Sequence, residues 1–91
     1  MALPSDMAFF SLLARAGSFS AAARLLEVST PAVSKRLAQM EARLGVLLLN
    51  RSTRRISVTQ EGEIYLTHAR RILAEIDDME QLVASSVAAH G

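Results

Sequence analysis

The residues best suited to recognise another molecule lie between Thr30 and Lys35. The Lys35 ammonium can donate hydrogen bonds to guanine O6 and N7, and the Ser34 hydroxyl can contact a base or a phosphate. The Pro31 ring and the Ala32 methyl can touch a thymine methyl group. If these residues begin a helix that enters the major groove of DNA, their side chains would reach the base edges.

Thr30-Pro31 is typical of a helix start, because threonine can cap the first turn and proline at the first helical position loses no hydrogen bond. The helix is predicted to run from Thr30 to about Leu44, where Gly45 favours a left-handed stop. The predicted buried positions are Val33, Leu37, Met40 and Leu44, spaced by four, three and four residues. The outward positions are Pro31, Ser34, Lys35, Ala38 and Gln39.

Two further helices are expected to position this one. The first is predicted from Pro4-Ser5-Asp6 to Ala16 with Gly17 as its stop, and the second from its cap Ser20 to Leu26. Val28-Ser29 would then form the turn into the helix at Thr30. The inward residues are expected to be Met7, Phe10, Leu13, Ala14, Ala22, Leu25 and Leu26, with Ala23 small enough to allow a close helix crossing.

Two short apolar segments, Leu47–Asn50 and Ile56–Val58, flank a basic stretch and predict a two-stranded hairpin, or wing. Its tip carries Arg51, Arg54 and Arg55, and no acidic residue lies between Glu41 and Glu61. Such a tip can lie along phosphates or insert an arginine into a narrow minor groove. The alternative is that these charges only protect an exposed strand edge.

Thr59 is expected to cap a long final helix, with Glu61 and Glu63 near its positive end. Apolar residues recur along it at alternating steps of four and three, which is typical of a coiled-coil seam. The helix has more apolar surface than a small domain can cover, so a second chain is the expected partner. The predicted dimerisation residues are Tyr65, Ala69, Ile72, Ile76, Met79 and Val83.

The net charge of +1 is divided unevenly along the 91 residues. Residues 1–59 carry eight basic and three acidic side chains, a net of +5, whereas residues 60–91 carry two basic and six acidic ones, a net of −4. This division favours a basic DNA-binding part over 1–59 and a separate dimerisation helix over 60–91.

Composition argues against other classes of protein. The sequence has no cysteine, and its two histidines, His68 and His90, have no cluster of ligands around them, so neither a metal site nor a cofactor is expected. Ser34 has no histidine or aspartate placed to activate it, so no enzyme chemistry is expected. The sequence shows neither a signal peptide nor a membrane-spanning run, which predicts a soluble, cytoplasmic protein associated with the nucleoid.

The order of these motifs resembles the N-terminal DNA-binding domain of LysR-type transcriptional regulators. The resemblance rests on Gly17-Ser18-Phe19-Ser20-x-Ala22-Ala23-x-x-Leu26, Val28-Ser29-x-Pro31-Ala32-Val33-Ser34, Leu37-x-x-Met40-Glu41-x-x-Leu44-Gly45 and Arg54-Arg55-x-x-x-Thr59-x-x-Gly62. This chain has Thr30 where the family often has glutamine, and Leu47-Leu48-Leu49 where it usually has Pro-Leu-Phe.

The resemblance implies a mainly α winged helix-turn-helix fold, with three helices and a two-stranded wing, followed by a long dimerisation helix. It implies a homodimer that binds an interrupted palindrome in a bacterial promoter. It also allows the full-length protein to form a tetramer. It also places Ser20 and Ser29 near phosphates. The full set of candidate DNA-binding residues is Ser20, Ser29, Thr30, Pro31, Ala32, Ser34, Lys35, Arg36, Gln39, Arg51, Arg54 and Arg55.

Regulators of this kind continue into a domain that senses a small molecule, whereas this sequence ends at Gly91. We therefore interpret it as an isolated DNA-binding domain without a small-molecule site. Two other interpretations stay open. The chain could be an interaction module that pairs with a full-length regulator without binding DNA productively, or it could be a winged helix-turn-helix of another family.

Overall fold

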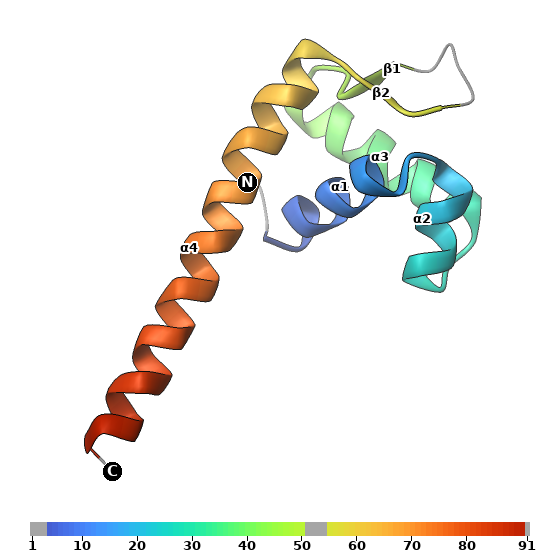
Figure 1. The fold of residues 1–91 in the computed structure, drawn as a ribbon. Helices are drawn as coiled ribbons and strands as arrows, with labels where there is room; N and C mark the ends of the chain where they lie inside the picture. Colours follow the sequence, from blue (N-terminus) through green and yellow to red (C-terminus); the bar gives the residue numbers. More distant parts are fainter. Residues whose placement is uncertain (1–3, 51–54, 91) are drawn as a thin grey trace.

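The computed structural model describes residues 4–50 and 55–90. Three helices form a compact head, a short hairpin covers one end of it, and a long fourth helix runs past the head and extends beyond it (Figure 1). The elements are α1 (Pro4–Ala16), α2 (Phe19–Leu26), α3 (Thr30–Leu44), β1 (Leu49–Asn50), β2 (Ser57–Val58) and α4 (Gln60–His90). The head is thus a helix-turn-helix followed by a wing.

Helix α1 is the centre of the core because α2 packs against one side of it and α4 against another. Phe10 and Leu13 are fully buried, as their helical spacing predicted. Phe9 and Ser11 are buried as well, although they lie off the predicted stripe. A helix that has neighbours on more than one side loses its simple amphipathic pattern.

The caps of α2 and α3 each lie on a different residue from the predicted one. Ser18, not Ser20, caps α2, and its hydroxyl accepts a hydrogen bond of 3.1 Å from the backbone nitrogen of Ala21. Ser29, not Thr30, caps α3, and its hydroxyl accepts a hydrogen bond of 3.2 Å from Ala32. The backbone conformation determines which of the neighbouring hydroxyls caps the helix. The capping residue has an extended backbone and lies three residues before the N–H group that donates to it.

The helix-turn-helix is closed by a residue that the sequence did not single out. Glu27 ends α2 in the left-handed conformation, with φ of 57°. Its backbone nitrogen donates a hydrogen bond to the carbonyl oxygen of Arg24. Ala22 is buried as predicted, and Ala23 is buried as well, whereas Leu25 is 65% exposed and the prediction for it was wrong. The predicted burial of Leu44 was also wrong, since the last turn of α3 lies at the surface beside Gly45.

The wing is shorter than predicted but lies at the predicted place. Strands β1 and β2 pair antiparallel, with Leu49 opposite Val58 and Asn50 opposite Ser57. The residue just before β2 is fixed to the head, because the backbone nitrogen of Ile56 donates to the carbonyl of Gly17 at 3.2 Å. The second strand of the wing is therefore held beside the turn between α1 and α2.

Helix α4 begins after Thr59, as predicted, and its first turns complete the core. The Thr59 hydroxyl accepts a hydrogen bond of 3.0 Å from the backbone nitrogen of Gly62. Leu66 and Ala69 are buried, and the Tyr65 ring stands edge-on to Phe10 at 5.4 Å between centroids. Tyr65 and Ala69, the first two residues of the predicted dimerisation seam, are thus half-buried and buried within their own chain.

Candidate nucleic-acid interface

The outer face of α3 carries small side chains together with two long polar ones. Pro31, Lys35, Ala38 and Gln39 are exposed, and Ser34 is half-buried beside them. Val33, Leu37 and Met40 lie on the opposite face and are buried against the head. The predicted buried and exposed faces of α3 are therefore confirmed at these positions. Small side chains on the outer face allow the helix backbone to approach another surface closely.

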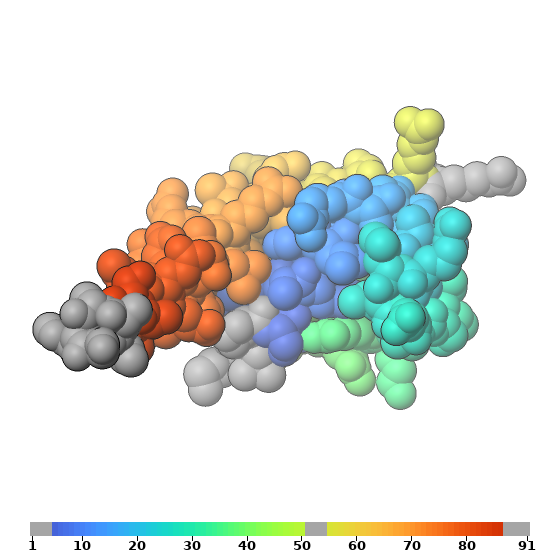
Figure 2. Space-filling view, turned by 60° about the horizontal axis from the view of Figure 1, so that its bottom comes forward, coloured from blue at the N-terminus to red at the C-terminus, as the bar shows by residue number. Residues whose placement is uncertain are grey.

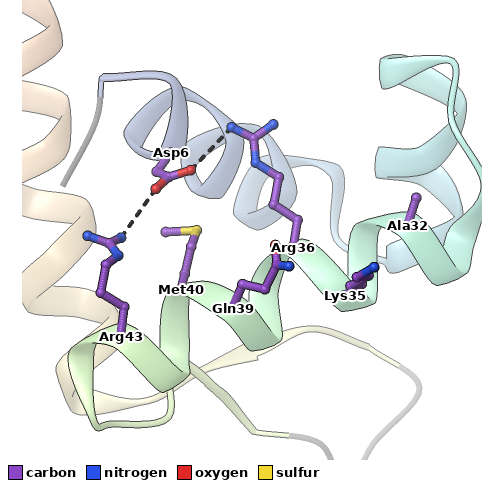
Figure 3. Close-up of a pocket in the computed structure, with 7 residues that line it drawn as sticks. All are labelled: Asp6, Ala32, Lys35, Arg36, Gln39, Met40 and Arg43. Carbon is purple, nitrogen blue, oxygen red and sulfur yellow. Dashed lines mark hydrogen bonds and ion pairs between the residues drawn. The ribbon is translucent and has the colours of Figure 1, made fainter. Parts of the chain in front are cut away.

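A carboxylate on α1 holds two arginines of α3 (Figure 3). The Asp6 carboxylate pairs with Arg36 and Arg43, each at 3.2 Å. The Arg36 guanidinium also lies over the Phe9 ring, 4.6 Å from its centroid. Arg36 is thus directed from α3 towards α1 and links the two helices. Two cations share one anion, so this flank keeps a positive charge.

No acidic side chain offsets the positive N-terminal ends of α2 and α3, the two helices of the helix-turn-helix. The first turns of α2 and α3, which the structure describes completely, contain no acidic residue, whereas Asp6 lies in the first turn of α1 and Glu61 in that of α4. Backbone N–H groups and the helix dipole favour an anion at such an end. Ser20 and Ser29, the predicted phosphate neighbours, are exposed close to these two ends.

The wing contributes one described basic side chain, Arg55, which is exposed. Arg51 and Arg54, the other two arginines of the predicted tip, lie outside the described residues. The strands nearest the tip are joined through their side chains, since the amide of Asn50 donates to the Ser57 hydroxyl at 3.2 Å. The two strands therefore have a fixed register where they lead into the tip.

Glu41, to which the sequence pattern assigned no structural role, is a positioning residue. It is 6% exposed, and its carboxylate accepts hydrogen bonds from the backbone nitrogens of Leu48, at 2.7 Å, and Leu49, at 3.4 Å. Its place four residues after Leu37 was the available signal, since that spacing puts it on the buried face. Glu41 therefore fixes the start of the wing relative to α3.

Beyond the core, α4 presents a row of apolar side chains to solvent. Ile72 is exposed, Ile76 is half-buried, and Met79 and Val83 are 55% and 60% exposed. These four are the remaining residues of the predicted dimerisation seam. The space-filling view shows this half of α4, in orange and red, projecting away from the head (Figure 2). The head has therefore left these side chains uncovered.

Tyr65 has an unusual environment at the junction of α1 and α4. Its hydroxyl oxygen is buried and has no hydrogen-bond partner among the described residues. Burial raises the pKa of Tyr65 above its usual value of 10.0, the Asp6 carboxylate raises this pKa further, and the Arg43 guanidinium opposes the increase. The neutral phenol is therefore the form that fits the folded head.

Two kinds of feature are absent from the part of the chain that the structure describes. Within residues 4–50 and 55–90, no group of three or more histidine, cysteine, aspartate or glutamate side chains could hold a metal ion. Over the same ranges, none of the helices combines the length and the apolar character that crossing a membrane requires.

Comparison with known proteins assigns the fold and the family. Residues 4–63 match the family described as bacterial regulatory helix-turn-helix proteins, lysR family. The structure resembles the crystal structure of a CbnR_DBD–DNA complex, with a TM-score of 0.84, 35% identity and coverage of 94% of this chain and 99% of that one. It resembles a BenM_DBD/catB site 1 DNA complex with a TM-score of 0.90, 26% identity and coverage of 99% and 97%. The predicted winged helix-turn-helix fold is confirmed.

Curated relatives give the same assignment. The HTH-type transcriptional activator AaeR of Escherichia coli strain K12 is 46% identical over 79 residues, which are 86% of this chain and 26% of that protein. The HTH-type transcriptional regulator CrgA of Neisseria meningitidis serogroup B is 44% identical over 71 residues, 78% of this chain and 24% of that protein. The chain thus spans about a quarter of the length of these relatives. It belongs to the lysR family of bacterial regulatory helix-turn-helix proteins.

Proposed function

We propose that this chain binds double-stranded DNA in a sequence-specific manner, as a dimer, with α3 in the major groove. In this proposal residues 1–59 make the DNA contacts and residues 60–91 pair the two copies, so that the dimer recognises an interrupted palindrome in a bacterial promoter. The two DNA complexes among the similar structures support DNA as the ligand. The setting would be the bacterial cytoplasm, at the nucleoid.

The outer face of α3 is the observation that carries the proposal. Pro31, Lys35 and Ala38 are exposed on the side opposite the core, so the outer face of this α-helix is available to a groove about 12 Å wide. Thr30, Pro31, Ala32, Ser34, Lys35 and Gln39 would contact bases from this helix. Lys35 is the donor of longest reach in this set and would specify guanine.

Phosphate contacts would come from the positions around α3. Ser20 and Ser29 lie at the acid-free starts of α2 and α3, and Arg55 lies on the wing. Arg51 and Arg54 are proposed to extend this set along the wing tip. Arg36 would take part only by leaving Asp6 or by sharing it, because its guanidinium is already paired. These contacts would set affinity and its salt dependence rather than sequence preference.

The exposed part of α4 would join the two copies. Ile72, Ile76, Met79 and Val83 recur at steps of four, three and four, and the head leaves them uncovered. Burying them against a second copy would remove this apolar surface from water. The length of α4 would then fix the distance between the two heads, and so the spacing of the two half-sites.

Selection of bound sequences from a random duplex pool, followed by titration at several salt concentrations, tests the DNA proposal. Lys35→Ala is expected to relax preference at one base step per half-site, costing roughly 1–3 kcal/mol on the selected site. Arg55→Ala is expected to weaken all sequences alike and to lower the salt slope by about 1. A protein-interaction module that does not use DNA would bind random duplex DNA hardly at all. Such a result would contradict the DNA proposal.

A further inference from the structure

A single carboxylate lies beside two arginines at the edge of the proposed DNA-binding surface. Asp6 of α1 and residues of α3 line a groove of about 430 Å³, and Lys35 and Gln39 of the outer face of α3 belong to its walls. Figure 3 shows Arg36 and Arg43 reaching from α3 to Asp6 within this groove. The groove therefore connects the ion pairs of Asp6 with the side chains proposed to contact bases.

Asp6 uses both of its carboxylate oxygens to hold these arginines. Oδ1 accepts a hydrogen bond from Arg36 and Oδ2 accepts one from Arg43, each at 3.2 Å. Hydrogen bonds between ionised partners are stronger than neutral ones. The contact of Arg36 with the Phe9 ring adds a cation–π attraction. Another anion that binds either guanidinium group must therefore compete with Asp6 for it.

The arginines are more open to solvent than the carboxylate that holds them. The side chains of Arg36 and Arg43 are 40% and 30% exposed, whereas that of Asp6 is 19% exposed. A DNA phosphate at the groove could therefore reach either guanidinium group. Binding it would remove a partner from a half-buried carboxylate or would bring two anions close together, and both changes cost free energy. Asp6 thus opposes phosphate contacts by these two arginines.

This opposition acts on one kind of DNA contact and not on the other. Phosphates are present in every sequence, so arginines that bind them raise the affinity for all duplexes alike. Lys35, which is proposed to contact base edges, forms no ion pair with the described side chains. A carboxylate that holds Arg36 and Arg43 but leaves Lys35 unpaired therefore acts on the sequence-independent part of the affinity.

We propose that Asp6 is a positioning residue that limits the sequence-independent affinity for DNA, because it holds Arg36 and Arg43 away from phosphates. This inference rests on the proposed DNA binding and adds to it a residue outside the helix-turn-helix. The two arginines lie two turns apart on one face of α3, roughly 10 Å at 1.5 Å per residue. When the charge of Asp6 is removed, both side chains become available to the phosphates of any duplex.

Titration of the 91-residue chain with a random-sequence duplex at several salt concentrations tests this role. Asp6→Asn removes the charge with little change in shape and is expected to lower the random-duplex Kd about three- to tenfold. The salt slope should become steeper by about 1 for each additional phosphate contact. Asp78→Asn makes the same change on the projecting half of α4, and it is expected to change the Kd less than about twofold, because salt screens a distant charge.

Two further variants distinguish this role from a purely structural one. Adding Arg36→Gln and Arg43→Gln to Asp6→Asn is expected to remove the gain in affinity and in salt slope. The base preference of Asp6→Asn should equal that of the natural chain, because Lys35 is unchanged. If Asp6 only fixed the orientation of α3, Asp6→Asn would weaken binding and relax the base preference, and this result would overturn the proposal.

Nuclear magnetic resonance of the natural chain tests the role without any change to Asp6. When random duplex is added, the Nε–Hε signals of Arg36 and Arg43 are expected to keep their positions, while backbone signals near Ser20 and Ser29 shift. A shift of both arginine signals would show that these side chains already bind phosphate and would overturn the proposal. This measurement decides the question if circular dichroism shows that Asp6→Asn is unfolded.

The outcomes separate this inference from the proposed function. If the natural chain binds neither the selected site nor random duplex, the proposed DNA binding is wrong and the role of Asp6 fails with it. If the natural chain binds the selected site while Asp6→Asn and Asp78→Asn share one random-duplex Kd and one salt slope, DNA binding stands and only the role of Asp6 is wrong.

Discussion

The Glu41 carboxylate accepts a hydrogen bond of 2.7 Å from the backbone nitrogen of Leu48, and this contact joins the proposed DNA-recognition helix to the wing. Both residues are buried. The same carboxylate lies 3.4 Å from the nitrogen of Leu49, where β1 begins. One side chain therefore satisfies the backbone at the strand start and fixes the direction in which the wing leaves the head.

Replacing Glu41 with alanine is expected to lower the free energy of unfolding by about 2–4 kcal/mol, because buried backbone donors lose their acceptor and a cavity remains. Thermal and urea denaturation measure the change. Glu63→Ala, an exposed change in α4, is expected to cost less than about 1 kcal/mol. Equal losses in the two variants would show that the Glu41 contact contributes little.

Gly62→Ala is expected to destabilise the head by about 1–3 kcal/mol or more, because no space is available for a side chain. A Cβ atom at this position would overlap the carbonyl oxygen of Leu48 and the Cγ1 atom of Val58. The backbone oxygen cannot move without disturbing the wing. His68→Ala, at an exposed position of the same helix, serves as the control, and unchanged denaturation midpoints in both variants would contradict this steric account.

Glu27→Gly is expected to stabilise the chain by roughly 0.5–1 kcal/mol. Glu27 has φ of 57°, which costs a non-glycine residue about 1–2 kcal/mol, and the larger entropy of an unfolded glycine offsets part of the gain. The matched change Arg24→Gly lies inside α2 and is expected to destabilise by about 1 kcal/mol. A loss of stability in both variants would indicate that Glu27 makes a contact that outweighs its strain.

Tyr65→Phe is expected to remove a pH dependence of stability. Because the pKa of Tyr65 is raised on folding, its contribution is fully present below pH 10 and is lost as the pH rises from there through the folded pKa. Urea denaturation between pH 8 and pH 11.5 should therefore show a steeper alkaline loss for the natural chain than for the variant. At pH 7 the variant should be equal or more stable by about 1 kcal/mol, because a buried hydroxyl without a partner is removed. Parallel curves would contradict both expectations.

Helix positions and the wing were predictable because they depend on local signals. Gly17, Gly45 and the apolar spacing of α3 determine where helices end and which face is buried, without reference to the rest of the chain. The helix caps were predicted at Ser20 and Thr30, two residues and one residue after the observed caps. Several hydroxyls lie close together there, and only the backbone conformation distinguishes them.

Contacts between distant segments were not predictable in the same way. Asp6 meets Arg36 and Arg43 across 30 and 37 residues of sequence, and nothing in the local pattern indicates that α1 begins beside α3. The apolar repeat of α4 is continuous from Tyr65 to Val83, yet α1 covers its first part and not its last part. Periodicity shows that a helix has an apolar face but not which neighbour covers each length of it.

The burial of Leu66 and Ala69 in the head has a consequence for how the protein is made. A nascent chain that has been elongated only through the wing has α1 with one side open to water, because the segment that covers Phe10 and its neighbours has not yet been synthesised. Translation must continue through about three turns of α4 before the fold can close. The recognition surface is therefore completed only after the ribosome has begun the helix that is proposed to join the two copies.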